Sequence, residues 1–360
     1  MYLFRKDLQA LQAPRISVPK AERMMCLNES CLNPYPVIEQ SFREILKFTG
    51  QNRYQSEVSD LLQTELAGYA GLQQEQLLFG NGADDMIYHL LLAVRDSVDS
   101  FALSLAPSYF DYKTFALEVG LKIRFLALDE DFHFDKDQYL ALAMHPDCKL
   151  AILCNPNNPT GNLFPQKDLL YIAENLPDTL VMVDETYYEF SGASLKEYLD
   201  KYPNLILIRS FSKAFSAAGL RFGYALSCAD NIAELRKVQS TFHTSLLVQA
   251  FALGILRNKQ TFLNQVREVI DMKEDLYLWL KSIPGLKVHY SKTNFLSFSL
   301  GAKSRDLFRY LLDDGIALRD VGAHPILKDH LRVTISCRED IARFRESLQN
   351  FLREGLAISN

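Results

Sequence analysis

The strongest constraint on the fold is a series of short apolar runs that alternate with helical segments. Runs typical of buried strands occupy residues 77–79, 101–105, 123–128, 150–154, 180–183 and 205–208. Stretches with helical periodicity lie between several of them, for example 86–92 and 110–120. Strands that alternate with helices at this spacing indicate an α/β fold with a mainly parallel sheet.

Polar residues directly follow several of these runs. Asp184 ends the run at 180–183, and the rigid turn NNPTG at 157–161 follows the run at 150–154. Open α/β sheets bind ligands at the carboxyl ends of their strands, so we expect these side chains to lie near one site. A carboxylate at the end of an apolar strand is poorly hydrated, so we expect Asp184 to have a cationic partner. A helix cap or a structural ion pair is the alternative for Asp184.

The stretch SFSKAFSAAGLR at 210–221 places a lysine just beyond an apolar strand. A buried lysine has a lowered pKa, and its neutral amine forms a Schiff base with an aldehyde. Ser210, Ser212 and Arg221 supply the hydroxyls and the cation that hold a phosphate. An aldehyde and a phosphate on one small molecule describe pyridoxal 5'-phosphate. Taken alone, Lys213 fits an ordinary surface lysine equally well.

The stretch GNGADD at 80–85 joins a strand to a helix. Free backbone N–H groups at such a helix start bind anions, and glycines let the backbone approach the ligand. It is not a nucleotide-binding P-loop, because no Gly-Lys-Ser/Thr follows. A purely structural turn would use the same residues.

Composition excludes several classes of function. The chain has 360 residues and a net charge of −5 with no long basic run, so we expect no nucleic-acid partner. No apolar run approaches the ~20 residues that cross a bilayer, and the charged start does not match a secretory signal. Six scattered cysteines, without a C-x-x-C pair or a nearby histidine cluster, indicate reduced thiols, no metal site and a cytoplasmic location.

The pattern of predicted helices and strands changes after about residue 256. Amphipathic helices at about 265–280 and 338–356 frame short strands at 287–290, 294–300, 316–319 and 331–336. We therefore divide the chain into an N-terminal arm with part of a small domain (1–36), a large cofactor-binding domain (37–256) and a small α+β domain (257–360).

Taken together, these motifs resemble fold-type-I pyridoxal-phosphate enzymes and, more narrowly, the histidinol-phosphate aminotransferase family. The resemblance covers roughly residues 27–338. Its motifs are LNE at 27–29, NRY at 52–54, GNGAD at 80–84, PSY at 107–109, NNPTG at 157–161, DETY at 184–187, SFSKAF at 210–215, GLR at 219–221 and LRVT at 331–334. Ser30 and Ala83 depart from it, because the family more often has asparagine and serine there. The family's N-terminal Pro-Tyr segment has no clear match before Asn28.

The resemblance implies a role for each matching residue. Catalysis would involve Lys213, which bonds the cofactor and moves the substrate α-proton, Asp184, which pairs with the ring nitrogen, and Tyr187, which with Asn158 binds the phenolic oxygen. Tyr109 would stack on the ring, and the phosphate would be held by Gly82, Ala83, Asp84, Ser210, Ser212 and Arg221. Tyr54 would reach the partner subunit's cofactor, which implies a homodimer with shared active sites. Substrate would contact Asn28, Glu29, Arg319 at its phosphate and Arg332 at its carboxylate.

The implied activity is transfer of an amino group from histidinol phosphate to 2-oxoglutarate, a step of histidine biosynthesis. An aromatic amino acid aminotransferase and a lyase similar to threonine-phosphate decarboxylases share nearly every motif. A regulatory protein that kept the fold is a different class. Such regulators carry an added DNA-binding domain, for which we expect the stretch before Asn28 to be too short, and they do not need both Lys213 and Asp184.

Overall fold

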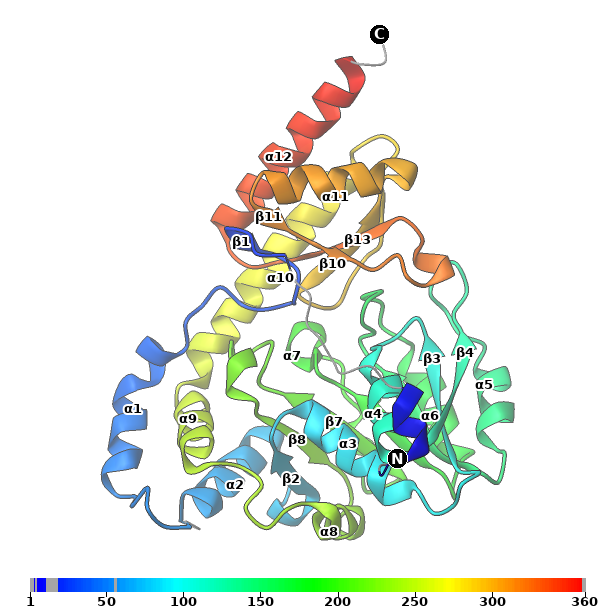
Figure 1. Cartoon of the computed structure of the whole chain (residues 1–360). Coiled ribbons are helices and arrows are strands. Elements are labelled where there is room, and N and C mark those ends of the chain that lie inside the picture. The colour runs from blue at the N-terminus through cyan, green and yellow to red at the C-terminus, as the bar shows by residue number, and fades with distance from the viewer. Residues whose placement is uncertain (1–2, 4, 11–18, 55–56, 358–360) are drawn as a thin grey trace.

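The computed structural model describes residues 3, 5–10, 19–54 and 57–357. Its centre is a seven-stranded sheet in the order β2-β8-β7-β6-β5-β3-β4 (Figure 1). All neighbouring pairs are parallel except those of β8, which runs antiparallel to both β2 and β7. The strands are β2 (Leu77–Gly80), β3 (Phe101–Ala106), β4 (Lys122–Ala127), β5 (Cys148–Cys154), β6 (Leu180–Asp184), β7 (Leu205–Ser210) and β8 (Gly223–Leu226). This confirms the predicted α/β class with a mainly parallel sheet.

Helices cover both faces of the sheet because the inner strands are apolar on both sides. One face packs on α3 (Ala83–Val94), α4 (Asp111–Val119) and α8 (Ala229–Val238). The other packs on α2 (Glu57–Ala70), α5 (Lys136–Ala143), α6 (Gln166–Glu174), α7 (Tyr188–Ser191) and α9 (Leu246–Arg257). Helix α1 (Tyr35–Lys47) packs against α9. Short 3-10 turns are η1 (Lys6–Ala10), η2 (Gln74–Gln76), η3 (Lys196–Tyr198) and η4 (Ala218–Leu220).

A second layer lies above the large sheet in Figure 1. It holds an antiparallel sheet in the order β12-β13-β10-β9, made of β9 (Lys287–Val288), β10 (Phe295–Ser299), β12 (Arg319–Asp320) and β13 (His330–Thr334). Helices α10 (Lys259–Lys281), α11 (Ser304–Asp313) and α12 (Arg338–Ala357) accompany it, with η5 (Gly301–Lys303) and η6 (Pro325–Leu327). The N-terminal arm also belongs to this layer, because its strand β1 (Arg23–Met24) pairs with β11 (Ile316–Ala317).

The segment predicted as one strand at 316–319 serves two sheets. β11 is parallel to β1, whereas β12 is antiparallel to β13, and Leu318 lies between them. Strand pairing is non-local, so the alternation of side chains could not reveal this change of partner. Its consequence is a register that places Arg319 opposite Arg332.

The apolar core runs from one layer into the other. Leu207 and Phe211 of the large sheet belong to the same buried cluster as Phe295 and Phe344 of the upper layer. All six cysteines are free thiols. Within the described residues, no helix is long and apolar enough to cross a membrane.

Candidate active site

The predicted site residues meet at the carboxyl ends of the central strands. Asp184 pairs in register with Cys154 on one side and with Ile208 on the other. The turn that carries Asn158 follows β5, and Lys213 follows β7. Parallel strands therefore bring these three side chains, which are distant in sequence, to one edge of the sheet.

Lys213 is held by the N-terminal arm. Its Nζ donates a hydrogen bond of 2.9 Å to the carbonyl oxygen of Leu27. Burial, with the positive charge of Arg332 as the next contribution, lowers the pKa of Lys213 to about 8. The neutral, nucleophilic fraction of this amine near neutral pH is therefore larger than that of an ordinary lysine.

Asp184 is a buried carboxylate that hydrogen-bonds only neutral groups. Its Oδ2 accepts from the Tyr112 hydroxyl at 2.7 Å, and its Oδ1 accepts from the Thr186 backbone N–H at 3.0 Å and hydroxyl at 2.6 Å. Burial raises the pKa of Asp184. Asp184 takes part in none of the ion pairs of the described residues, so its expected cationic partner is not one of their side chains. A protonated ring nitrogen would supply the missing charge.

The start of α3 and the segment before β8 pack closely enough to form an anion cradle. A Cβ on Gly223 would lie 2.3 Å from the backbone nitrogen of Ala83, and one on Gly82 would lie 2.8 Å from the guanidinium of Arg221. Gly82 also has a φ of 101°, which favours glycine. The N-terminus of α3, its partial positive charge and Arg221 thus lie together.

Asp84 and two serines complete this cradle. The Asp84 carboxylate accepts from Arg221 at 2.6 Å and from the Tyr109 hydroxyl at 3.1 Å. The Ser212 backbone N–H donates to the Ser210 hydroxyl at 3.1 Å. Helix start, hydroxyls and guanidinium are the donor set of a phosphate site, and Lys213 and Asp184 fit the aldehyde and ring nitrogen of the same molecule. The residues present therefore fit pyridoxal phosphate.

Arg332 lies in the wall formed by β13 and the arm. It is only 8% exposed, and it donates to the Asn158 side-chain oxygen at 2.6 Å and to the Cys26 carbonyl at 2.9 Å. Its buried Nε has no hydrogen-bond partner. Burial, and then the charge of Arg319, lowers the pKa of Arg332 to about 10. This guanidinium is therefore held in place with unused donor capacity.

Arg319 is half-buried on the strand next to Arg332. In the described part of the chain, it forms none of the ion pairs and none of the side-chain hydrogen bonds. Like charges opposite each other on neighbouring strands repel. Neither guanidinium forms an ion pair within the described residues, although Arg319 lies near enough to Asp111 for their charges to interact, so both can bind an anionic ligand.

The arm supplies the remaining wall. The Asn28 side chain donates to the Tyr187 hydroxyl at 2.8 Å, and its backbone N–H donates to the Thr334 hydroxyl at 2.9 Å. Tyr187 is 2% exposed, and burial raises its pKa. Glu29 follows Asn28, half-buried and near enough for its charge to act on Lys213.

Tyr54 is the predicted site residue that the single chain does not bring to Lys213. Its side chain is 82% exposed, and its ring stacks on Phe242 with 3.9 Å between ring centroids. Its surface position agrees with a role toward a second subunit without testing it.

Sequence reasoning missed the partners that orient the predicted residues. Tyr112 and Thr186 fix Asp184, and the carbonyl of Leu27 holds Lys213. Tyr112 lies on the buried face of α4 with Ala116 and Val119, so helical spacing could have indicated that it is buried. No local signal marks the Leu27 carbonyl.

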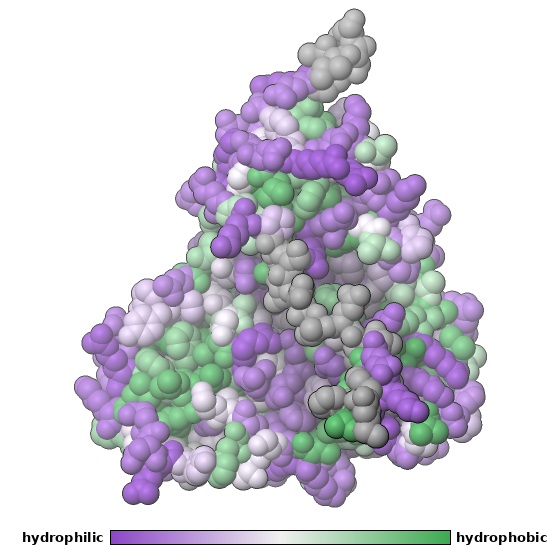
Figure 2. All heavy atoms as spheres, in the orientation of Figure 1, coloured by the Kyte–Doolittle hydropathy of each residue, from purple (hydrophilic) through white to green (hydrophobic). Residues whose placement is uncertain are grey.

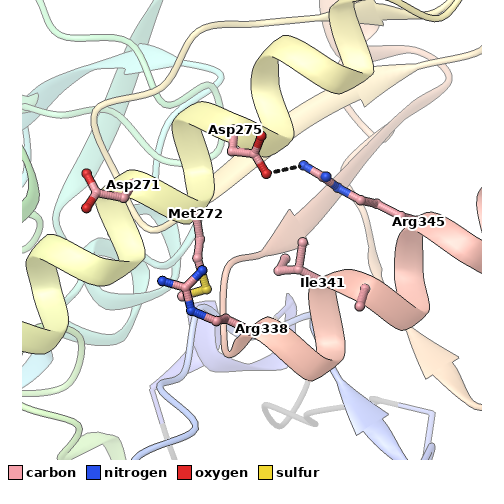
Figure 3. A pocket seen from close by; sticks show the side chains of 7 residues that line it. Asp271, Met272, Asp275, Arg338, Ile341 and Arg345 are labelled. Atoms are coloured by element: carbon pink, nitrogen blue, oxygen red, sulfur yellow. Dashed lines mark hydrogen bonds and ion pairs between the residues drawn. The ribbon is translucent and has the colours of Figure 1, made fainter.

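Two pockets lie apart from these residues. One of about 390 Å³, between α10 and α12, is lined by Asp271, Met272, Asp275, Arg338, Ile341, Ala342 and Arg345 (Figure 3). Its Asp275 and Arg345 pair with each other at 2.7 Å. The other, of about 350 Å³, is lined by Asp131, Phe132, Asn162, Leu163, His289, Tyr290 and Lys292. Lys213 lines neither pocket. We therefore place the candidate active site at the carboxyl ends of the central strands, where Lys213 lies, and not in either pocket.

Known proteins similar to this chain align with nearly all of it. Histidinol-phosphate aminotransferase of Thermoanaerobacter pseudethanolicus is 32% identical over 339 residues, which cover 94% of this chain and 95% of that protein. Histidinol-phosphate aminotransferase of Thermococcus kodakarensis is 33% identical over 343 residues, covering 94% and 96%.

Solved structures agree in fold. Histidinol-phosphate aminotransferase of Sinorhizobium meliloti, in complex with pyridoxal-5'-phosphate, superposes with a TM-score of 0.87 at 23% identity and 98% coverage of both chains. L-threonine-O-3-phosphate decarboxylase of Porphyromonas gingivalis gives 0.77 at 22% identity, covering 92% of this chain and 99% of that one. At these identities the likeness shows the fold alone.

The family model for aminotransferase class I and II matches residues 24–348. This range contains the lysine, the strand-end aspartate, the anion cradle and both arginines described above. The chain therefore belongs to the class I and II aminotransferases and is a pyridoxal-phosphate-dependent enzyme of that family.

Proposed function

We propose that the protein transfers the amino group of histidinol phosphate to 2-oxoglutarate. The observation that carries this proposal is the pair of arginines, Arg319 and Arg332, that face each other without an anionic partner in the described chain. Histidinol phosphate offers a phosphate, and 2-oxoglutarate offers two carboxylates. The names of the relatives at 32% and 33% identity support the same substrate.

We assign the cofactor contacts to the residues that the geometry gathers. Ser210, Ser212, Arg221 and the helix start at Gly82, Ala83 and Asp84 would hold the phosphate. Asp184 would hold the ring nitrogen, Tyr109 would cover the ring, and Tyr187 and Asn158 would bind its phenolic oxygen. The side-chain oxygen of Asn158 is used by Arg332, which leaves its amide N–H₂ to donate.

The protein side of the mechanism follows from these positions. Bound pyridoxal phosphate supplies an aldehyde for the amine and a ring that accepts negative charge from the substrate α-carbon. Asp184 would hold the ring nitrogen and favour its protonated form, because the buried carboxylate would gain a cation only in that state. Lys213 would take the substrate α-proton on Nζ and return it. Its lowered pKa suits a base that works near neutral pH.

The substrate is positioned by Arg332 and Arg319. Arg332 is fixed by Asn158 and Cys26, so it would hold a carboxylate in one orientation as a fork. Arg319 would bind the phosphate, the group that distinguishes histidinol phosphate from aromatic amino acids. Asn28 and Glu29 would line the side of the substrate that the arm covers.

We further propose a homodimer in which Tyr54 reaches the partner's cofactor phosphate. Hydrophobic residues gather on the lower left of the molecule, around α1, α2 and α9 (Figure 2). Exposed apolar side chains of these elements and of the nearby segments include Tyr35, Phe48, Tyr54, Leu61, Phe242 and Leu247. A second subunit would remove this surface from water. We retain the domain division at 37 and 257 and a cytoplasmic location as parts of this proposal.

A substrate panel tests the activity. Histidinol phosphate, phenylalanine, tyrosine and threonine phosphate are each mixed with the holoenzyme, and the visible spectrum of the cofactor and the products are followed. We expect the largest kcat/KM with histidinol phosphate and glutamate as the second product in the presence of 2-oxoglutarate. Preference for phenylalanine would replace the proposed substrate, and release of carbon dioxide from threonine phosphate would replace the reaction.

Subunit mixing tests the shared site. Tyr54→Phe and Lys213→Ala proteins are each impaired, but their heterodimer would contain one intact site. We expect mixing to restore activity once subunit exchange is confirmed by mass. Exchange without recovered activity contradicts the assignment of Tyr54.

A further inference from the structure

A buried ion pair lies behind the residues assigned to the cofactor. Asp184 and Ser210 end the neighbouring strands β6 and β7, with Asp184 in register with Ile208. The Glu185 backbone N–H donates to the Ile208 carbonyl at 2.8 Å, so the pairing continues one residue past β6. Because side chains alternate along a strand, Glu185 and Arg209 lie on the face opposite Asp184 and Ser210.

Glu185 and Arg209 form a buried, hydrogen-bonded ion pair, with Glu189 and Tyr224 near enough for their charges to act on Arg209. Their side chains are 1% and 2% exposed, with 2.9 Å between charged atoms. The Glu185 carboxylate also accepts from the Ser194 hydroxyl at 2.9 Å and the Leu195 backbone N–H at 2.8 Å. Arg209 also donates to the Ser194 hydroxyl at 2.7 Å, and its guanidinium lies 3.7 Å from the centre of the Tyr188 ring.

Stability alone does not account for this pair. It lies in a core whose neighbouring strand residues, Val183 and Leu207, are apolar. Replacing a buried ion pair by apolar residues of similar volume is often neutral or stabilising, because both charges lose their hydration. The pair does provide direction, since each hydrogen bond fixes one atom against another. These hydrogen bonds therefore fix the ends of β6 and β7 relative to each other.

We propose that Glu185 and Arg209 are positioning residues for the cofactor, which hold the ends of β6 and β7 at the separation that Asp184 and Ser210 need to bind one molecule together. This rests on the roles proposed above for Asp184 and Ser210. Neither Glu185 nor Arg209 touches the cofactor in this account. They act from the back of the sheet, through the backbone of the residues beside them.

The test removes the charges and keeps the volume. In the double variant Glu185→Gln/Arg209→Met the glutamine oxygen can still accept from Leu195, and no unpaired charge remains at these positions. Burial raises the pKa of the nearby Glu189 to about 7, and the charge of Arg209 lowers it, so the loss of Arg209 would favour the neutral form of this carboxyl. We therefore expect a folded protein with a Tm near that of the wild type. We expect its Kd for pyridoxal phosphate to rise roughly tenfold or more, as when outer-shell partners of metal ligands are removed.

Asn204 offers a matched control near the opposite ends of the same two strands. It lies before β7, is 6% exposed, and its side chain donates to the carbonyls of Ala173, Leu176 and Thr179 at the far end. Asn204→Leu should lower Tm and leave the Kd for pyridoxal phosphate unchanged. If the double variant binds the cofactor as the wild type does, or Asn204→Leu weakens binding equally, Glu185 and Arg209 do not position the cofactor.

A separate measurement distinguishes failure of this inference from failure of the proposed roles. Borohydride reduction and peptide mapping of the wild-type holoenzyme should label Lys213. A label on another lysine would overturn the site itself. A label on Lys213, with wild-type affinity in the double variant, would overturn only the positioning role.

Discussion

The cofactor end and the substrate end of this site are built differently. At the cofactor end, the Asp184 carboxylate accepts three hydrogen bonds from described residues and the Lys213 amine donates one to them. At the substrate end, Arg332 keeps an unpaired Nε and Arg319 forms no ion pair within the described residues. One end is nearly complete without ligand, and the other has cations without an anion. The difference indicates a fixed cofactor and exchangeable anionic substrates.

We expect the largest effect from a variant that disrupts the cofactor end of the site. Lys213→Ala should lower kcat by about four orders of magnitude or more, because it removes both the nucleophile and the base. Borohydride reduction should then fix no cofactor to the protein, as judged by mass spectrometry. Substantial turnover in this variant would show that another group carries the proton.

Asp184→Asn should act on the same end by removing charge alone. Asparagine keeps the shape and the contact with Tyr112, so we expect pyridoxal phosphate to remain bound. Turnover should fall by roughly 10²–10³-fold, the cost of losing one well-placed electrostatic contact. Steady-state rates with saturating cofactor measure this. Near-normal turnover would show that Asp184 only stabilises the turn at Thr186 and does not act on the cofactor.

Arg332→Lys tests whether the substrate end can be changed without affecting the cofactor end. A lysine cannot contact Asn158, Cys26 and a carboxylate in the planar geometry of the guanidinium. The loss should be about 30-fold in kcat/KM for 2-oxoglutarate, since a buried charge contact costs at least about 2 kcal/mol. The Kd for pyridoxal phosphate should change little. A cofactor affinity that falls as much as kcat/KM would mean that the two ends are not separate.

The last effect is on stability and concerns Lys213 in the apoenzyme. Its pKa is about 8 in the folded chain and 10.5 ordinarily, so between these values the unfolded chain binds more protons. Stability relative to Lys213→Met should therefore rise with pH from 8 to 10.5, by at most about 3 kcal/mol. Urea unfolding of both apoproteins at pH 7.5, 8.5 and 9.5 measures this difference. A difference that stays flat or falls would show that Lys213 is not buried as described.

The sequence predicted the cofactor end far better than the contacts that support it. Apolar runs locate β5, β6 and β7, and polar residues directly after them locate Asn158, Asp184 and Lys213, because position at a strand end is a local property. The Lys213 contact with Leu27 spans 186 residues and the Arg332 contact with Asn158 spans 174. Such pairings depend on how the arm and the upper sheet fold back, which periodicity does not encode.

In the upper sheet, too, the sequence did not predict pairing between distant segments. Alternation predicted a strand around Arg319, and the residue does lie on one. The change of partner from β1 to β13, which places Arg319 beside Arg332, depends on pairing between distant segments. The antiparallel β8 between β2 and β7 was likewise not predicted. Its pairing brings Gly223 against the start of α3, which shapes the anion cradle.

The most direct test of the account is the specificity of Arg319→Ala, because this arginine distinguishes a phosphate-bearing donor from an aromatic amino acid. The measurement is kcat/KM for histidinol phosphate and for phenylalanine, in the wild type and in the variant. We expect a loss of about 30-fold or more for histidinol phosphate, from the roughly 2 kcal/mol or more that a buried charge contact provides, and a small change for phenylalanine. Equal losses for both substrates, or no loss for histidinol phosphate, would contradict the account.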